Sequence, residues 1–361
     1  MNPLHIGDLS IPIPIIQGGM GIGISLSSLA SAVANAGGIG VISTVGIGLI
    51  HSTSQKDYRL NNTNGVIKEI RRARKLSSGI IGVNIMTVLS NYEDLVKTSI
   101  AEGIDIIFSG AGLPLNLPKY KTENCNTKLV PIVSSGRAAQ IIAKKWIQQF
   151  DYIPDAFVVE GPKAGGHLGF SIDDLKDDSI NLSDLLADVL KVTEKLETEY
   201  NRKIPVIVAG GIMTGSDIFE MMEKGASAVQ LGSRFIATKE CDASEKFKQA
   251  VIDVEKDSIK IIKSPVGLPG RAITNDFLTT SKTQGRLSKQ CKFHCITSCD
   301  PKTTEYCIAD ALLSAYEGNF ENGFVFCGAE AYRIKSMTTV PELFEELITD
   351  YHAALERKGG N

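Results

Sequence analysis

One histidine follows a glycine-rich stretch, EGPKAGGHLG, at residues 160–169. The stretch continues a hydrophobic run that ends at Glu160, and Gly165 and Gly166 come directly before His167. An imidazole titrates near neutral pH, so it can serve as a general base or as a hydrogen-bond donor. The alternative is a loop histidine that only hydrogen-bonds a carbonyl group. Its glycine neighbours at the end of a strand favour function, and we predict that His167 is the catalytic residue.

Three further glycine clusters follow hydrophobic runs: QGGMG at 17–21, AGGI at 209–212 and QLGSR at 230–234. Consecutive glycines let the backbone approach a flat ligand and present its N–H groups, although a tight turn explains the first cluster equally well. The second and third clusters follow the last two of eight such runs. In (β/α)8 barrels the loops at these two positions commonly hold a phosphate. We therefore predict a phosphate site at Gly210, Gly211, Gly232 and Ser233.

Weaker polar signals stand at the ends of three other runs. They are Asn84, the stretch 109–112 (SGAG) and the pair Ser134–Ser135. In a barrel the reactive groups lie at the carboxyl ends of the strands. We expect these groups to face the mouth of the barrel as a set.

The runs that would position these residues are short and rich in β-branched side chains, and segments of helical periodicity separate them. This alternation predicts a parallel sheet with crossover helices. Eight strands favour a (β/α)8 TIM barrel, and an open doubly wound sheet is the alternative. The predicted strands are 14–17, 39–43, 80–85, 104–109, 129–133, 156–160, 205–209 and 228–231.

The alternation stops near residue 238. Helices are predicted at 26–36, 66–76 and 183–201 within the barrel, and at 243–257, 310–316 and 341–355 after it. The stretch 264–270 contains proline and glycine and is predicted to be a loop. We expect a barrel with the ligand site at 1–238, a smaller, mostly helical lid or second domain at 239–340, and a C-terminal helix and tail at 341–361.

Composition excludes several classes of function. The 361 residues carry a formal net charge of -3 with scattered basic residues, so we expect no nucleic-acid partner. The N-terminus does not resemble a signal peptide, and no stretch reaches about 18 uninterrupted apolar residues, so we expect a cytoplasmic protein without membrane contact. Seven cysteines, an odd number, fit a reducing compartment.

Four cysteines fall close together, at Cys291, Cys295, Cys299 and Cys307, with His294 among them. Four thiolates can bind zinc or an iron–sulfur cluster, but this spacing lacks the CxxC pairs that are usual for either. A spacing of four residues also fits buried cysteines on one face of a helix. We favour the helix face and keep the metal or cluster site as the alternative.

The motifs together resemble the nitronate monooxygenase family, formerly called 2-nitropropane dioxygenases. PIIQGGMG, GVNI, SGAG, EGxxAGGHxG, AGGI and QLGSRF occur in order between Pro14 and Phe235, and ENGFVFCG continues the match more loosely. The related type II enoyl-ACP reductases share the same pattern. The resemblance therefore covers nearly the whole chain.

What the resemblance implies is an FMN-dependent oxidoreductase. The FMN phosphate would lie near Gly210, Gly211, Gly232 and Ser233. The flavin ring would lie near Gly18, Gly19, Met20 and Asn84. Further cofactor contacts would be Gly110, Ser134, Glu160 and Gly166. In the nitronate enzymes the histidine of the GGH motif, here His167, is taken as the base for neutral nitroalkanes.

The expected activity is oxidation of alkyl nitronates by molecular oxygen to a carbonyl compound and nitrite. The alternative is NAD(P)H-dependent reduction of enoyl thioesters carried on acyl carrier protein. Two other hypotheses are a redox-sensing flavoprotein that uses the cysteines and a sugar-phosphate enzyme on the same barrel. We expect a small-molecule substrate and a homodimer.

One departure from the family lies beside the histidine. Many members have Met-Glu before AGGH where this chain has Pro162-Lys163. The local charge changes sign, and a nearby cation disfavours the protonated imidazole. We expect Lys163 to lower the pKa of His167.

Overall fold

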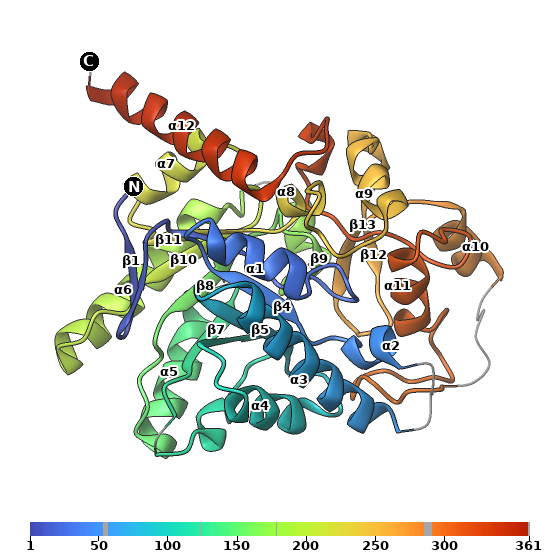
Figure 1. Cartoon of the computed structure of the whole chain (residues 1–361), viewed down its shortest axis with the longest axis horizontal. Coiled ribbons are helices and arrows are strands. Elements are labelled where there is room, and N and C mark those ends of the chain that lie inside the picture. The colour runs from blue at the N-terminus through green and yellow to red at the C-terminus, as the bar shows by residue number, and fades with distance from the viewer. Residues whose placement is uncertain (53–56, 124, 178, 285–290, 360–361) are drawn as a thin grey trace.

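The computed structural model describes residues 1–52, 57–123, 125–177, 179–284 and 291–359. Residues 285–290 of the predicted second domain and 360–361 of the predicted tail lie outside the described residues. The central sheet has eight parallel strands in the order β3-β11-β10-β8-β7-β6-β5-β4. A bridge between Ile16 and Ile39 joins its two ends, and the Gln17 N–H donates to the Ile39 carbonyl at 3.0 Å. The predicted barrel is therefore confirmed, and the open sheet is excluded (Figure 1).

All eight predicted strands are present, with bounds that differ from the prediction by two residues or fewer. Their β-branched side chains are buried on both faces, as in other sheets covered by helices. The strands are β3 Ile15–Gln17, β4 Gly40–Ser43, β5 Ile81–Met86, β6 Ile106–Gly110, β7 Lys128–Val133, β8 Phe157–Glu160, β10 Val206–Ala209 and β11 Ala228–Leu231.

Successive residues of each strand alternate between two hydrophobic clusters. In β8, Val158 packs inside the barrel, whereas Phe157 and Val159 pack against the surrounding helices. This period of two is that of any strand. A two-stranded hairpin, β1 Leu4–Ile6 and β2 Leu9–Ile11, adds its apolar side chains to the inner cluster and closes the amino-terminal end of the barrel.

Helices surround the barrel. They are α1 Ser27–Asn35, α2 Ile47–His51, α3 Tyr58–Leu76, α4 Tyr92–Ala101, α5 Gly136–Phe150, α6 Leu182–Tyr200, α7 Gly215–Glu223, α8 Ser233–Ile236 and α12 Val340–Gly359, with short 3-10 turns at Leu117–Tyr120 and Asp174–Lys176. Side-chain caps fix several of their starts, since Ser135 accepts from the Ala138 N–H and Thr214 forms a capping box with Asp217. None of the helices in the described ranges is long and apolar enough to cross a membrane.

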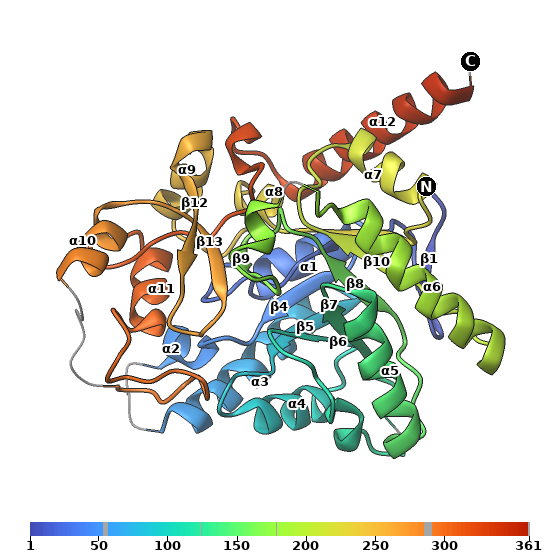
Figure 2. The ribbon, with the colours of Figure 1, turned by 180° about the vertical axis from the view of Figure 1, so that it is seen from behind.

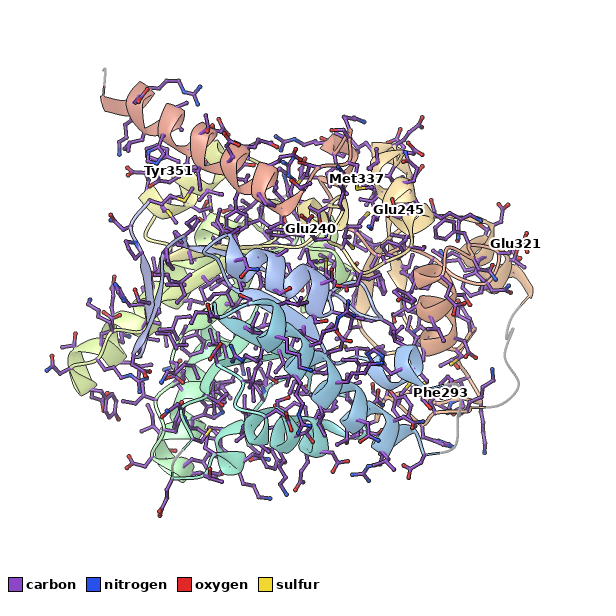
Figure 3. All side chains as sticks on the ribbon, in the orientation of Figure 1. Glu240, Glu245, Phe293, Glu321, Met337 and Tyr351 are labelled. Carbon is purple, nitrogen blue, oxygen red and sulfur yellow. The ribbon has the colours of Figure 1, made fainter. Side chains whose placement is uncertain are left out.

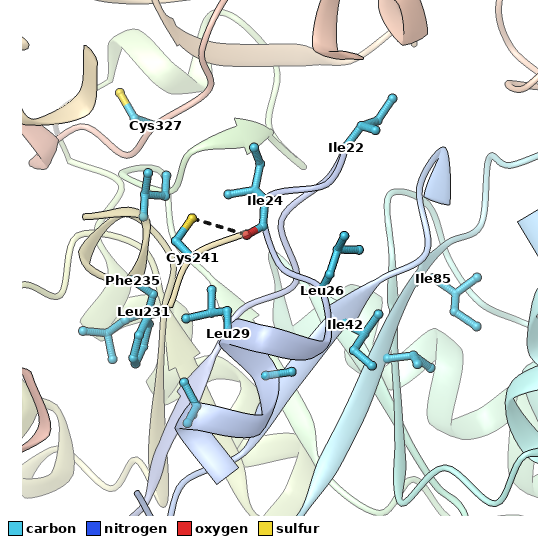
Figure 4. Close-up of a cluster of buried hydrophobic side chains, with 14 of the residues drawn as sticks. Ile22, Ile24, Leu26, Leu29, Ile42, Ile85, Leu231, Phe235, Cys241 and Cys327 are labelled. Carbon is cyan, nitrogen blue, oxygen red and sulfur yellow. Dashed lines mark hydrogen bonds between the residues drawn. The ribbon is translucent and has the colours of Figure 1, made fainter. Parts of the chain in front are cut away.

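An apolar wall lies between α1 and the end of β11 (Figure 4). Leu26 and Leu29 contribute to it from the side of α1, and Leu231 and Phe235 from the side of β11, and all four are buried. The Cys241 thiol donates to the Ile24 carbonyl at 3.4 Å, as the dashed line in Figure 4 marks. This packing fixes the loop that follows β3 against the segment that follows β11.

Residues 240–337 form an insertion between α8 and α12. It holds α9 Glu245–Ile252, α10 Asp276–Gln284 and α11 Ile308–Tyr316, with 3-10 turns at Lys256–Ser258 and Ala331–Arg333. It also holds a hairpin of β12 Ile259–Lys263 and β13 Pro269–Ile273, which we had not predicted. The expected loop at 264–270 is therefore only partly right, because its end is strand. Figures 1 and 2 show the insertion on one side of the barrel.

The chain leaves the barrel and returns to it at one place. Thr238 and Thr338 form a parallel bridge, and the Thr338 N–H donates to the Ala237 carbonyl at 3.0 Å. Helix α12 then packs beside α7, where Asp350 accepts from the Ser216 N–H at 2.8 Å (Figures 1 and 2). The last helix of the chain thus completes the helical layer, and the expected division into three parts stays a prediction.

Candidate active site

A cavity opens at the carboxyl ends of the barrel strands, and the insertion supplies part of its wall. Its volume is about 1530 Å³, counted out to open solvent. The predicted site residues that line it are Gly18, Gly19, Met20, Asn84, Gly110, Glu160, Gly166, His167, Gly210, Gly211, Gly232 and Ser233. Ser134 is outside this wall, where its hydroxyl donates to the Gly169 carbonyl at 2.8 Å.

The floor of the cavity is close-packed backbone. A Cβ atom at Gly19 would lie 2.3 Å from the Cβ of Asn84, so only glycine fits there. The Gly18 N–H donates to the Leu231 carbonyl at 2.8 Å, which joins the loop after β3 to the end of β11. Gly18 and Gly19 therefore present bare backbone to the cavity, against which a planar ring could lie.

The predicted phosphate cradle lies where β10 and β11 end side by side. Gly210 and Gly211 have φ values of 98° and 89°, a region that favours glycine. A Cβ atom at Gly232 would meet only the Met20 sulfur, at 3.6 Å, and would otherwise project into open space. The Ser233 hydroxyl accepts from the Gly328 N–H at 2.8 Å and keeps its own hydrogen for another acceptor. Small residues and donors surround a space that an anionic group would fill.

Sequence reasoning missed a second donor, Ser43, which stands at the end of β4. Its side chain is 1% exposed and lines the cavity, yet its hydroxyl has no hydrogen-bond partner among the described residues. Buried polar groups in native proteins almost always have a partner. The observation fits a ligand with a polar edge, such as a flavin, in contact with this wall.

His167 is held by the insertion rather than by the barrel. It lies in β9 Gly166–His167, which pairs antiparallel with β13 as the third strand of the β12-β13-β9 sheet. Its Nε2 is 2.7 Å from the Ser264 hydroxyl, and its ring is 5.0 Å from that of Phe326. Burial lowers the pKa of His167 to about 4, so the imidazole is neutral at pH 7.

Arg271, on β13, holds the loop that precedes the histidine. Its guanidinium donates to the carbonyls of Pro162, at 2.6 Å, and Ala164. Burial raises the pKa of Glu160, at the other end of the loop, to about 7, and the Arg271 charge opposes that rise. The insertion thus fixes both the histidine and the loop that carries it.

Nearly the whole chain matches one known family. The model of the nitronate monooxygenase family matches residues 2–350. The chain belongs to the nitronate monooxygenase family. It is a flavin-dependent oxidoreductase that acts on a small-molecule substrate.

Two similar proteins support the assignment to the nitronate monooxygenase family. A probable nitronate monooxygenase of Staphylococcus saprophyticus is 27% identical over 299 residues, which are 75% of this chain and 78% of that protein. A second, from Staphylococcus aureus, is 27% identical over 301 residues, with the same coverage.

Two solved structures have a similar fold. FabK from Thermotoga maritima has a TM-score of 0.73 and 27% identity, and the match covers 97% of this chain and 96% of that one. The nitroalkane oxidase from Streptomyces ansochromogenes has a TM-score of 0.73 and 22% identity, with 96% and 98% covered. The second likeness shows the fold alone.

Lys163, the departure from other family members, does not act on the histidine as we expected. Its ammonium pairs with Glu330 at 2.8 Å, and its side chain is 61% exposed. The low pKa of His167 comes from burial, with no contribution from Lys163. The aliphatic part of the Lys163 side chain instead packs next to the cradle. A Cβ atom added at Gly211 would lie 3.0 Å from it.

The cysteine-rich segment is not a helix, so that interpretation was wrong. Its backbone is irregular: His294 has a φ of 46°, and Ile296 bridges Leu89. Helix α11 begins only after Cys307, which is its N-cap residue. Phe293, labelled in Figure 3, packs its ring 5.7 Å from that of Tyr58 on α3.

The four thiols lie near one another, and burial raises the pKa of Cys295 to about 12, with a smaller contribution from the neighbouring thiols. Across the described ranges, these cysteines included, no three histidine, cysteine or acidic side chains are placed to hold a metal ion. No disulfide joins any of the seven cysteines, all of which the structure describes. Another cysteine, Cys327, lines the cavity itself, a position that its spacing in the sequence does not reveal.

Proposed function

We propose that this enzyme binds FMN and oxidises alkyl nitronates with molecular oxygen. The carbon–nitrogen bond breaks, nitrite leaves, and the carbon becomes a carbonyl. The net reaction balances when two nitronate anions and one dioxygen molecule give two carbonyl compounds and two nitrite ions. A homodimer stays a prediction.

The cavity suits FMN in three respects. Gly211, Gly232 and Ser233 surround a space that one phosphate would fill, and a single cradle fits FMN rather than FAD. Gly18 and Gly19 form a floor of bare backbone, and Ser43 offers a hydroxyl without a partner among the described residues. When bound, the flavin accepts electrons from the substrate and transfers them to oxygen.

The observation that carries the proposed function is a neutral imidazole, His167, in the wall of this glycine-floored cavity. The resemblance assigns it the role of a base toward neutral nitroalkanes. A base works best when its pKa is close to the working pH, and a pKa of about 4 is far below it. The site therefore suits a nitronate, which arrives already deprotonated, and His167 would contact its nitro group.

A second candidate is the reduction of enoyl thioesters with NAD(P)H as electron donor. The likeness to FabK, at 27% identity over 97% of this chain, favours it. The same flavin site serves both reactions, so the electron donor decides between them.

The test is anaerobic rapid mixing of the purified yellow holoenzyme with propionate 3-nitronate and, separately, with NADH or NADPH. We expect the nitronate to bleach the flavin and the nucleotides to leave it oxidised. Bleaching by a nucleotide alone would select the reductase. A His167→Gln holoenzyme should keep its flavin spectrum and lose about 10–100-fold in kcat/KM for the nitronate, the effect of one hydrogen bond to a charged group.

A further inference from the structure

Ser264 occupies a fixed position beside the histidine. It lies in the turn that connects β12 to β13, is 3% exposed, and its carbonyl accepts from the Gly267 N–H at 3.0 Å. The Ser298 hydroxyl donates to the Val266 carbonyl at 2.7 Å and holds the turn from the other side. The Ser264 hydroxyl therefore has little freedom to move away from the imidazole.

The hydroxyl has two contacts and one hydrogen. Ser264 Oγ accepts from the Val266 N–H at 3.3 Å, and it is 2.7 Å from His167 Nε2. If the hydroxyl donates to Nε2, its hydrogen and both contacts are satisfied, and the imidazole carries its hydrogen on Nδ1. If Nε2–H donates instead, the hydroxyl hydrogen is left without an acceptor among the residues that the structure describes. An unmet buried donor disfavours that second arrangement by roughly tenfold or more.

The other nitrogen is left for the ligand. Nδ1 of His167 makes no hydrogen bond to any described residue, while the ring lines the cavity. Phe326, at 5.0 Å, packs against the ring and restricts its rotation. The ring thus presents one polar atom to the cavity.

We infer that Ser264 is a positioning residue that holds His167 as the Nδ1–H tautomer, so that the enzyme presents a hydrogen-bond donor to an anionic nitro group. The inference rests on the proposed function for the identity of that anion. Nδ1 already carries a hydrogen and the Nε2 lone pair accepts from Ser264, so neither nitrogen takes a proton from carbon. The low pKa of this half-buried ring agrees with this role. The substrate class is therefore the preformed nitronate, and neutral nitroalkanes are poor substrates.

The direct test is ¹⁵N NMR of the FMN-loaded enzyme with labelled histidine. The chain has five histidines, and the spectrum of the His167→Gln variant identifies the signals of residue 167. We expect a protonated Nδ1 and a bare Nε2 in the wild type, and loss of this preference in Ser264→Ala. A bare Nδ1 in the wild type would overturn the inference.

The kinetic test compares kcat/KM for a nitronate with that for the neutral nitroalkane of the same carbon skeleton. We expect Ser264→Ala to lower this ratio about tenfold, as expected when one hydrogen bond is lost. Ser264→Thr keeps a hydroxyl and should restore the ratio. Lys263→Met, an exposed change at the residue before Ser264, is the matched control, and its ratio should stay that of the wild type.

The two proposals fail differently. An unchanged ratio in Ser264→Ala contradicts the positioning role even if nitronates are oxidised. If neither substrate bleaches the flavin, the proposed function fails, and the NMR spectrum alone decides whether Ser264 sets the tautomer.

Discussion

Two regions meet at the cavity, and different parts of the fold build them. The cradle at Gly211 and Gly232 belongs to the barrel, where parallel strand pairing fixes the ends of β10 and β11. His167 belongs to a small antiparallel sheet with β13, and Ser264 and Phe326 of the insertion set its surroundings. Cofactor binding thus depends mainly on the barrel and substrate chemistry mainly on the insertion, and the two meet where the Gly328 N–H donates to the Ser233 hydroxyl. A change away from that contact should affect one region more than the other.

The largest effect that we expect is a loss of FMN binding when the cradle is changed and the surroundings of His167 are not. Gly232→Asp places a carboxylate where the phosphate of FMN would lie, and like charges repel at close range. The side chain has room, so the apoprotein should fold normally. We expect FMN affinity, measured by flavin fluorescence titration, to fall at least about 100-fold.

The control for this change is Gly232→Ala, which adds a methyl group without charge and should weaken binding far less. Full visible absorbance of the purified Gly232→Asp protein would show that the phosphate lies elsewhere.

A change in the insertion should lower turnover while FMN binding is kept. Arg271→Met removes both hydrogen bonds that hold the loop before His167, whereas the pairing of β10 with β11, whose ends carry the cradle, does not involve Arg271. We expect nitronate turnover to fall about 100-fold, as a small displacement of a reacting group can cause, with FMN still bound. Lys260→Met, an exposed change on the neighbouring strand β12, is the matched control. Loss of flavin together with turnover would mean that cofactor binding also depends on the insertion.

The smallest effect concerns stability and tests whether the histidine region is dry. In the unfolded chain His167 should titrate near 6.5, and burial lowers its pKa in the folded protein to about 4. Between these values the unfolded state binds more protons, so stability is lost as the pH falls below 6.5. From pH 7 to pH 5, the unfolding free energy of the apoprotein should fall by about 2 kcal/mol more in the wild type than in His167→Gln.

Urea unfolding at the two pH values measures this difference. His352→Gln, on the exposed side of α12, is the control and should behave like the wild type. An equal loss in the wild type and His167→Gln would mean that water reaches the imidazole.

The barrel was predictable from the sequence because its signal is local and repeated. The strands are short runs rich in β-branched residues, as Phe157–Glu160 illustrates, and a glycine-containing turn follows most of them. Eight such runs favour a closed barrel. The hairpin β12–β13 was not predictable in the same way, since Pro269 and Gly270 indicate a loop. Strand β9 has two residues, too few for any periodicity.

The candidate site was predictable only where it belongs to the barrel. Gly211 and Gly232 follow their strands directly, so their order along the chain places them together. Ser264 is 97 residues from His167, and Glu330 is 167 residues from Lys163. No local pattern reports such partners, which is why the effect of Lys163 on the histidine was predicted wrongly.

The parallel bridge between Thr238 and Thr338 has a consequence for how the insertion could be replaced. Because the segment 240–337 leaves and rejoins the barrel at adjacent residues, it can be exchanged between homologues with one pair of cuts that lie together in space. The pairing of the barrel strands and the contact between α7 and α12 involve no residue of this segment, so the exchange would leave both unchanged. It would carry Ser264, Arg271 and Phe326 as a unit. Such an exchange would replace the surroundings of His167 while the eight strands of the barrel stay the same.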